Sequence, residues 1–346
     1  MLAPPIAPML AELARELPRG DFLYEPKWDG FRCIAFVERD GRVDLRSRHG
    51  KPFARYFPEL VRALAAIGER CVIDGEIVIA REGGFDFAAL MLRTHPASTR
   101  VARLATETPA TFVAFDLLAV GDETWTERPF VERRARLESL LARVPREGEG
   151  RVELTPATDD VAVASAWLEG AQRGIDGVVA KPRTLRYAPG KRAMIKVKPE
   201  HTADCVLAGM RVHQPTEKEP RPAVASLLLG LWDGDVLRHV GVCSTFTAAR
   251  RRALVEELRA DVVALEGHPW EHGFGLEPSP MGRLPGAAGR WAPGEMALDW
   301  LPLRPERVVE VAYDHLDATR FRHPARFVRW RVDREARSCT FEQLPR

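Results

Sequence analysis

Short apolar runs, each soon followed by a glycine or an Asp-Gly pair, recur through the first 120 residues, at 33–37, 72–80 and 111–120. This pattern is typical of strands in a largely antiparallel sheet. Apolar positions with helical spacing alternate with these runs and predict helices at 9–17, 59–67, 131–144 and 160–173. Two further strands are predicted at 177–181 and 193–198. The first 200 residues therefore indicate an α+β domain.

The pattern changes around residues 199–204. Beyond them we expect one helix at 247–265 and strands at 205–212, 226–232, 236–243 and 308–313. Several short strands and a helix are typical of a small β-barrel. The stretch 266–303 is rich in Gly and Pro and predicts long loops. Since 346 residues suffice for two cores, we place one domain at 1–200 and the other at 201–346.

The composition excludes several protein classes. Apolar residues make up 45% of the chain and charged residues 29%, as in an ordinary globular protein. No apolar run approaches the roughly 20 residues that span a bilayer, and the proline-containing start has no basic residue and does not resemble a signal peptide. The 5 cysteines are scattered without a C-x-x-C pair, which argues against a zinc ribbon or a disulfide framework. We therefore expect a cytoplasmic protein with no membrane partner.

Lysine is rare in this chain. The 51 basic residues comprise 44 arginines and 7 lysines, and the net charge is only +2, so any nucleic-acid site must be a local patch. Four lysines lie in motif-like segments: Lys27, Lys181, Lys196 and Lys198. A guanidinium stays protonated, whereas an amine can lose its proton and act as a nucleophile. These positions indicate a chemical need for an amine, with chance placement as the competing interpretation.

Lys27 lies in the segment 25–32, Glu-Pro-Lys-Trp-Asp-Gly-Phe-Arg. The Asp-Gly pair favours a turn that presents the amine at the end of a strand. Arg32 follows as an anion-binding fork. The same string also suits a plain surface hairpin.

Acidic and aromatic residues interrupt two of the predicted strands. Asp74 and Glu76 share one face of the strand 72–80. Buried carboxylates are costly unless a partner meets them, and a metal ion, a ribose or Lys27 would serve. A structural ion pair is the alternative. Phe115, in the strand 111–120, is either a core residue or a stacking platform for a base.

The remaining basic segments suggest phosphate binding. Lys196 and Lys198 share a face, with Ile195 and Val197 directed into the core. Paired ammonium groups attract phosphate and favour the neutral form of a third nearby lysine, although the doublet could also be two solvated lysines. In the segment 320–334, six arginines alternate with aromatic residues, which indicates phosphate contacts or a solvated basic face.

The order of these segments is more informative than any one of them. Lys-x-Asp-Gly, Asp-Gly-Glu, Phe-Asp, Asp-Gly-Val-Val-Ala-Lys and Lys-Val-Lys in succession resemble the covalent nucleotidyltransferase superfamily. The segments 47–51 and 56–60 resemble bacterial ATP-dependent DNA ligases, above all the compact two-domain actinobacterial type called ligase C. The resemblance covers essentially the whole chain. It implies an α+β fold: an adenylation domain of antiparallel sheets and helices, followed by a C-terminal OB-fold β-barrel.

The resemblance also implies a mechanism and roles for residues. Lys27 would attack the α-phosphate of ATP and hold AMP, which would pass to the 5′-phosphate of nicked double-stranded DNA before the 3′-hydroxyl displaces it. The other implied roles are Glu25 beside the adenine, Phe115 stacked on it, Glu76 at the ribose and the metal, Asp176 on a divalent cation (Mg²⁺ or Mn²⁺), Lys196 and Lys198 on the α-phosphate, Arg32 and Arg48 on the nick ends, and Arg331 with Asp333 on the pyrophosphate. We expect a monomer that acts in DNA repair in the bacterial nucleoid.

Two positions depart from the family pattern. Asp176 stands where Glu is common, and Arg334 stands where Lys is common. RNA ligases and messenger-RNA guanylyltransferases share the lysine motif and remain alternatives. A non-catalytic nucleic-acid-binding protein is a further alternative, against which the intact set of lysines and carboxylates argues.

Overall fold

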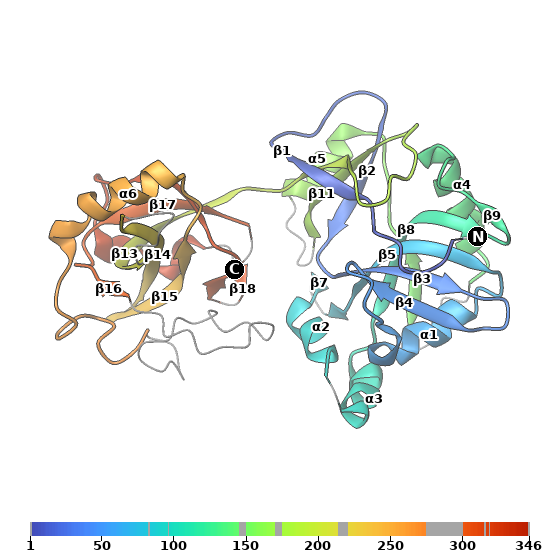
Figure 1. The fold of residues 1–346 in the computed structure, drawn as a ribbon, viewed down its shortest axis with the longest axis horizontal. Coiled ribbons are helices and arrows are strands. Elements are labelled where there is room, and N and C mark those ends of the chain that lie inside the picture. The colour runs from blue at the N-terminus through green and yellow to red at the C-terminus, as the bar shows by residue number, and fades with distance from the viewer. Residues whose placement is uncertain are drawn as a thin grey trace. The chain divides into compact units, whose positions relative to one another are not determined.

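The computed structural model describes residues 2–81, 84–95, 97–144, 150–169, 175–213, 221–274, 300–314, 316–317 and 319–344. Contacts divide the chain into two compact units, Met1–Pro199 and Glu200–Arg346 (Figure 1). Among the described residues, no helix combines the length and the apolar character needed to cross a bilayer.

The first unit contains a four-stranded sheet in which β11 lies between β12 and β2. The strands, in sheet order, are β1 (Leu10–Ala14), β12 (Arg192–Val197), β11 (Ile175–Pro182) and β2 (Phe22–Trp28). Strand β11 is antiparallel to both neighbours, and β1 is parallel to β12. Helix α5 (Val161–Glu169) packs on β11 and β2.

The second sheet of this unit carries the larger core. Its strands, in order, are β10 (Arg151–Leu154), β8 (Thr111–Val120), β5 (Cys71–Val78), β3 (Phe31–Val37) and β4 (Val43–Ser47), with β9 (Glu123–Thr124) beside β8. A short hairpin pairs β6 (Ala80–Arg81) with β7 (Gly84–Phe85). All residues of β8 are buried, as expected for a strand covered on both faces.

Helices cover one face of the second sheet and the first sheet covers the other. Besides α5, the described residues of this unit form the helices η1 (Ala54–Tyr56), α1 (Pro58–Ala65), α2 (Phe87–Arg93), α3 (Ser98–Glu107) and α4 (Phe130–Leu141). Leucines of α1 and α4 pack against Ala35 and Ile73 of the sheet. On the opposite face, Ile34 and Val72 pack against Met194 of the first sheet. Most of the active-site candidates lie on strands of these two sheets.

Most of the predicted elements of the first unit are confirmed, and one is wrong. The segment 9–17 is not a helix: it contains strand β1, which pairs with β12 and leaves Leu13 63% exposed. Its helical spacing is overridden by backbone pairing along the edge of the first sheet. Helices α2 and α3 were not predicted, although Asp86 caps α2 by accepting a hydrogen bond from the backbone N–H of Ala89.

The second unit is built on an antiparallel sheet around a single core. Its strands, in order, are β15 (Val236–Cys243), β14 (Ala223–Asp233), β13 (His201–His213), β17 (Val308–Tyr313) and β20 (Arg326–Trp330). Short strands β16 (Leu301–Pro302), beside β13, and β18 (Leu316–Asp317) with β19 (Arg320–Phe321) complete it. A bridge between Cys243 and Ala325 brings the two edges of the sheet together.

Helices of the second unit are α6 (Ala248–Glu257) and the short 3₁₀ turns η2 (Arg259–Asp261), η3 (Ala336–Ser338) and η4 (Phe341–Gln343). The predicted strands of this unit are confirmed. The predicted helix 247–265 was too long, because the chain leaves helical geometry after Leu258 and forms η2. Residues 275–299 of the predicted loop region lie outside the described residues.

Candidate active site

The strand pair β2–β11 is irregular where Lys27 lies. The register of this antiparallel pair shifts between Ile175 and Val178. Asp176 and Gly177 together therefore oppose the single residue Lys27, which is the arrangement of a β-bulge. The bulge directs the carboxylate of Asp176 toward the amine.

Gly177 makes this bulge possible. Its φ of +131° is one that residues with side chains rarely adopt. A Cβ atom there would lie 2.1 Å from the carbonyl oxygen of Val197 and 3.1 Å from Cα of Lys198. The glycine therefore allows β11 to approach the end of β12, which carries the lysine doublet.

Three charged side chains meet at the bulge. Lys27 Nζ donates to Asp176 Oδ2, and Lys198 Nζ lies 2.9 Å from the same oxygen. The Asp176 side chain is 6% exposed, whereas those of Lys27 and Lys198 are 24% and 20% exposed. One buried carboxylate thus holds two amines that still reach solvent.

Lys196 completes the cluster. Burial lowers its pKa, and the charges of Lys27 and Lys198 lower it further, partly offset by Asp176. The expected proximity of the doublet to Lys27 is therefore present. The core contacts come from Val197, which is buried, and from Ile195, which is partly buried.

Arg32 and Asp74 form an ion pair between neighbouring strands. Arg32 Nε and Nη2 donate to the two carboxylate oxygens of Asp74, each at 2.6 Å, and Asp74 is fully buried. The Tyr187 hydroxyl donates to Asp74 Oδ2 at 2.6 Å and accepts from the backbone N–H of Met9 at 3.1 Å. Asp74 therefore forms a structural ion pair, which was the alternative interpretation of its sequence position. The pair fixes the Arg32 guanidinium.

Glu76 lies opposite Arg32 in the β3–β5 register. Burial raises the pKa of its carboxyl to about 7, while Arg32 and Lys27 act in the opposite direction. A carboxyl with this pKa changes charge near neutral pH, and a bound cation would favour its ionised form. Glu76 is thus a partly buried carboxyl within the electrostatic reach of the lysine cluster.

A buried network that the sequence analysis missed lies behind Lys27. Glu25 is 2% exposed; its Oε2 lies 2.7 Å from Lys181 Nζ and its Oε1 accepts from Arg134 Nη1 at 3.0 Å. Arg134 also donates to the Thr155 carbonyl at 2.6 Å. An arginine on the core side of a predicted helix, as at Arg134, was the available signal. The network fixes strand β2 two residues before Lys27.

Phe115 lies between cations. Arg32 Cζ is 4.3 Å from the ring centroid and Lys181 Nζ is 4.8 Å from it. Lys181 also donates to the Phe115 carbonyl at 3.1 Å. The ring is 8% exposed, so Phe115 is both a core residue and a neighbour of the cluster.

Two predicted site residues belong to other elements of the chain. Arg48 is exposed in the turn after β4, and no described contact joins it to the lysines. Arg331 belongs to the second unit and pairs there with Asp204 and Asp333.

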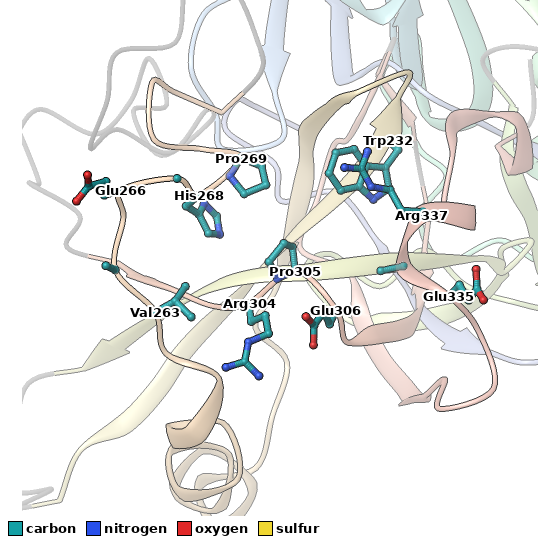
Figure 2. Close-up of a pocket in the computed structure, with 13 residues that line it drawn as sticks. Trp232, Val263, Glu266, His268, Pro269, Arg304, Pro305, Glu306, Glu335 and Arg337 are labelled. Atoms are coloured by element: carbon teal, nitrogen blue, oxygen red, sulfur yellow. The ribbon is translucent and has the colours of Figure 1, made fainter.

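The second unit contains a cavity of about 650 Å³. Arg337 lies over the Trp232 ring at 3.6 Å from its centroid, and Glu306 and Glu335 contribute carboxylates (Figure 2). None of the predicted site residues lines it.

Carboxylates that could hold a metal ion are few. Among the described residues, no three His, Cys, Asp or Glu side chains form a metal-binding group. Asp176 pairs with Lys27, and the charge of Lys27 also acts on Glu76.

Comparison with protein families covers nearly the whole chain. Residues 1–198 match the family of the ATP dependent DNA ligase domain, and residues 220–334 match the ATP dependent DNA ligase C terminal region. The chain is 53% identical to DNA ligase C2 of Mycolicibacterium smegmatis and 50% identical to DNA ligase C of Mycobacterium tuberculosis. Each alignment covers 99% of this chain and 94% of the relative.

Solved structures agree with this relationship. The ligase domain of M. tuberculosis LigD is 25% identical, with a TM-score of 0.50, and the match covers 97% of this chain and 98% of that one. A structure of mycobacterial DNA ligase D complexed with ATP and MES matches equally well. These matches confirm the predicted α+β nucleotidyltransferase fold and favour DNA over RNA as the substrate. The chain therefore belongs to the ATP-dependent DNA ligases, and within them to the actinobacterial ligase C type.

Proposed function

We propose that this DNA ligase seals nicks in duplex DNA through an AMP adduct on Lys27. The observation that carries the proposal is the bulge that holds Asp176 against Lys27, with Lys196 and Lys198 beside it. A nucleophilic lysine needs a fixed position, a route to its neutral form and cations for the phosphate that it attacks. The cluster supplies groups suited to all three needs.

The reaction consists of three transfers. The neutral amine of Lys27 attacks the α-phosphorus of ATP; the bond to pyrophosphate breaks, a P–N bond forms and the amine proton leaves. An oxygen of the 5′-phosphate of the nick then attacks the AMP phosphorus; the P–N bond breaks and Lys27 leaves as an amine, taking up a proton. Finally the 3′-hydroxyl attacks the 5′-phosphate, loses its proton and releases AMP. Lys196 and Lys198 would stabilise negative charge on the α-phosphate in the first two transfers.

Asp176 and Glu76 are suited to a divalent cation, Mg²⁺ or Mn²⁺. Mg²⁺ is commonly held by one or two carboxylates, with substrate phosphates and water as its other ligands, so two acidic groups suffice. When bound, the cation would neutralise charge on the phosphates and leaving group. Asp176 also holds the Lys27 ammonium before reaction. A cation drawn to Asp176 would weaken that ion pair and favour the neutral amine.

Other residues are proposed to hold the nucleotide and the DNA. Glu25 and Phe115 would form the adenine site, which the buried contacts of Lys181 and Arg134 make rigid. Arg32 and Arg48 would bind the nick ends. In the second unit, proposed to be an OB-fold, Arg331 and Asp333 would orient pyrophosphate during the first transfer only.

The cellular role is also a proposal. Among the relatives, LigD of Pseudomonas aeruginosa, 31% identical over 98% of this chain, is named a multifunctional non-homologous end joining protein. We propose that the present enzyme acts as a monomer in DNA repair in the nucleoid.

Covalent labelling tests the role of Lys27. With α-labelled ATP and Mg²⁺, Lys27→Ala and Lys27→Arg should both lose label transfer, because an arginine cannot supply a neutral amine. Lys191→Arg, at an exposed lysine in the same unit, is the matched control and should label normally. Label retained on either Lys27 variant, or mapped by mass spectrometry to another residue, would refute the assignment.

A further inference from the structure

Asp204 of β13 joins two arginines from the end of the chain to the sheet of the second unit. Its Oδ2 accepts from Arg331 Nη1 at 2.7 Å and from Arg334 Nη1 at 2.5 Å. The side chain is 7% exposed. Gln343 accepts from the Asp204 backbone N–H at 2.8 Å and donates to its carbonyl at 3.1 Å. Asp204 is therefore a buried anion on a fixed backbone.

The bonds around Arg331 leave part of its guanidinium available. Nε and Nη2 donate to the two carboxylate oxygens of Asp333, each at 2.9 Å, and Nη1 donates to Asp204. A guanidinium has five N–H groups. Beyond the described bonds, one N–H remains on each of Nη1 and Nη2, and a guanidinium N–H is a strong donor to a phosphate oxygen.

The two carboxylates do not hold Arg331 in the same way. Asp333 is only two residues away in the chain and its side chain is 64% exposed, so it moves with Arg331. The Arg331 backbone N–H donates to the Val308 carbonyl at 2.9 Å, which fixes the main chain. Among the described contacts, Asp204 is the group that fixes the guanidinium itself relative to the sheet.

We propose that Asp204 is a positioning residue for self-adenylylation: it fixes the guanidinium of Arg331 so that its remaining N–H groups can meet the phosphates of ATP. This inference rests on the proposed role of Arg331 in the first transfer. Asp204 itself does not touch the nucleotide.

The chemistry of Asp204 fits positioning better than simple support of the fold. Its Oδ1 is buried without a hydrogen-bond partner among the described residues. An unsatisfied buried oxygen costs stability, so a carboxylate is a poor choice for packing alone. Its charge is balanced by two arginines.

The contacts of Arg334 explain why an arginine suits this position. This arginine, which replaces the family's usual lysine, donates to Asp204 through Nη1 and to the Oγ and carbonyl oxygen of Ser338 at 3.2 Å. The three bonds use the three different nitrogens of the planar guanidinium.

The test compares two steps of the reaction in the full-length protein. Asp204→Asn keeps the shape and one acceptor but removes the charge, and Asp204→Ala removes both. We expect Asp204→Asn to slow label transfer from ATP at least about tenfold, since misplacement of a catalytic group by 1 Å can cost about 100-fold. Sealing of a pre-adenylylated nick should keep its rate. Adding Asp204→Asn to Arg331→Ala should cause no further loss.

The matched control is Glu310→Gln. Glu310 lies opposite Asp204 in the β13–β17 register and its Oε2 accepts from Arg329 Nε at 2.6 Å. The variant Glu310→Gln should leave the rates of both steps unchanged. The positioning role would be overturned if Asp204→Asn slowed both steps to the same extent. It would also be overturned if Glu310→Gln slowed label transfer as much as Asp204→Asn does. Normal labelling of Asp204→Asn while Arg331→Ala fails to label would overturn it too. Normal labelling by Arg331→Ala would instead refute the proposed function of Arg331.

Discussion

Substitution of Gly177 by alanine tests whether the bulge opposite Lys27 shapes the site. Two costs can be worked out from the structure. A φ of +131° strains a residue that has a side chain by about 1–3 kcal/mol. The new Cβ would also lie 2.1 Å from the Val197 carbonyl oxygen, so either β11 or the end of β12 must move. We expect a total loss of about 3 kcal/mol or more in the free energy of unfolding.

The loss should appear both in stability and in chemistry. For a unit of this size, about 3 kcal/mol lowers Tm by roughly 6–12 °C. Whichever strand moves, the lysine doublet at the end of β12 shifts relative to Asp176, so label transfer from ATP should fall by more than the folded fraction does. Thermal unfolding, followed by labelling well below the Tm of the variant, separates these effects.

Gly121→Ala is the matched control for this prediction. Gly121 also has a positive φ, +59°, but a Cβ there would meet nothing within 4 Å. Gly121→Ala should lower the free energy of unfolding by only about 1 kcal/mol and leave labelling unchanged. Equal losses for Gly177→Ala and Gly121→Ala, or full labelling by folded Gly177→Ala, would refute the idea that this close approach shapes the site.

Two further predictions concern buried charge. Asp74→Asn should destabilise the protein by about 3 kcal/mol in urea unfolding, because it leaves the Arg32 guanidinium without its counter-ion. The control is Asp40→Asn, which breaks the exposed ion pair with Arg42 and should have no measurable effect. Equal effects of the two variants would refute the distinction between buried and exposed ion pairs. Burial, aided by the charge of Arg320, lowers the pKa of His239 from 6.5 to about 3. Between these values the unfolded chain takes up a proton that the folded chain does not. The free energy of unfolding should therefore fall as the pH falls from about 6.5 toward 3. His239→Phe should remove this loss. The free energy of unfolding of the variant minus that of the parent should therefore be about 2 kcal/mol larger at pH 5 than at pH 8. A difference that does not change with pH would contradict the prediction.

The lysine cluster could be predicted from sequence because its chemistry restricts residue type. Only lysine supplies the amine, so the placement of Lys27, Lys196 and Lys198 in a chain of arginines was informative. The strands at 111–120 and 236–243 were located to the residue because turn signals border predominantly apolar segments.

Contacts between distant segments could not be predicted. The helical spacing at 9–17 describes one segment, whereas its pairing with β12 depends on residues about 180 positions away. The same holds for the bonds from Arg134 to Glu25 and from Arg331 to Asp204, because no local pattern indicates which residue is the partner. The bulge at Gly177 is similar, since an Asp-Gly pair is equally compatible with an ordinary turn.

The parallel pairing of β1 with β12 matters for anyone who expresses or trims this enzyme. The amino-terminal segment supplies Met9, whose backbone N–H meets the Tyr187 hydroxyl, and it covers the edge of the strand that bears Lys196. Truncation through Ala14 would uncover a row of backbone donors and acceptors along that strand and invite self-association. An affinity tag is better attached to a linker before Leu2 than substituted for any part of this segment.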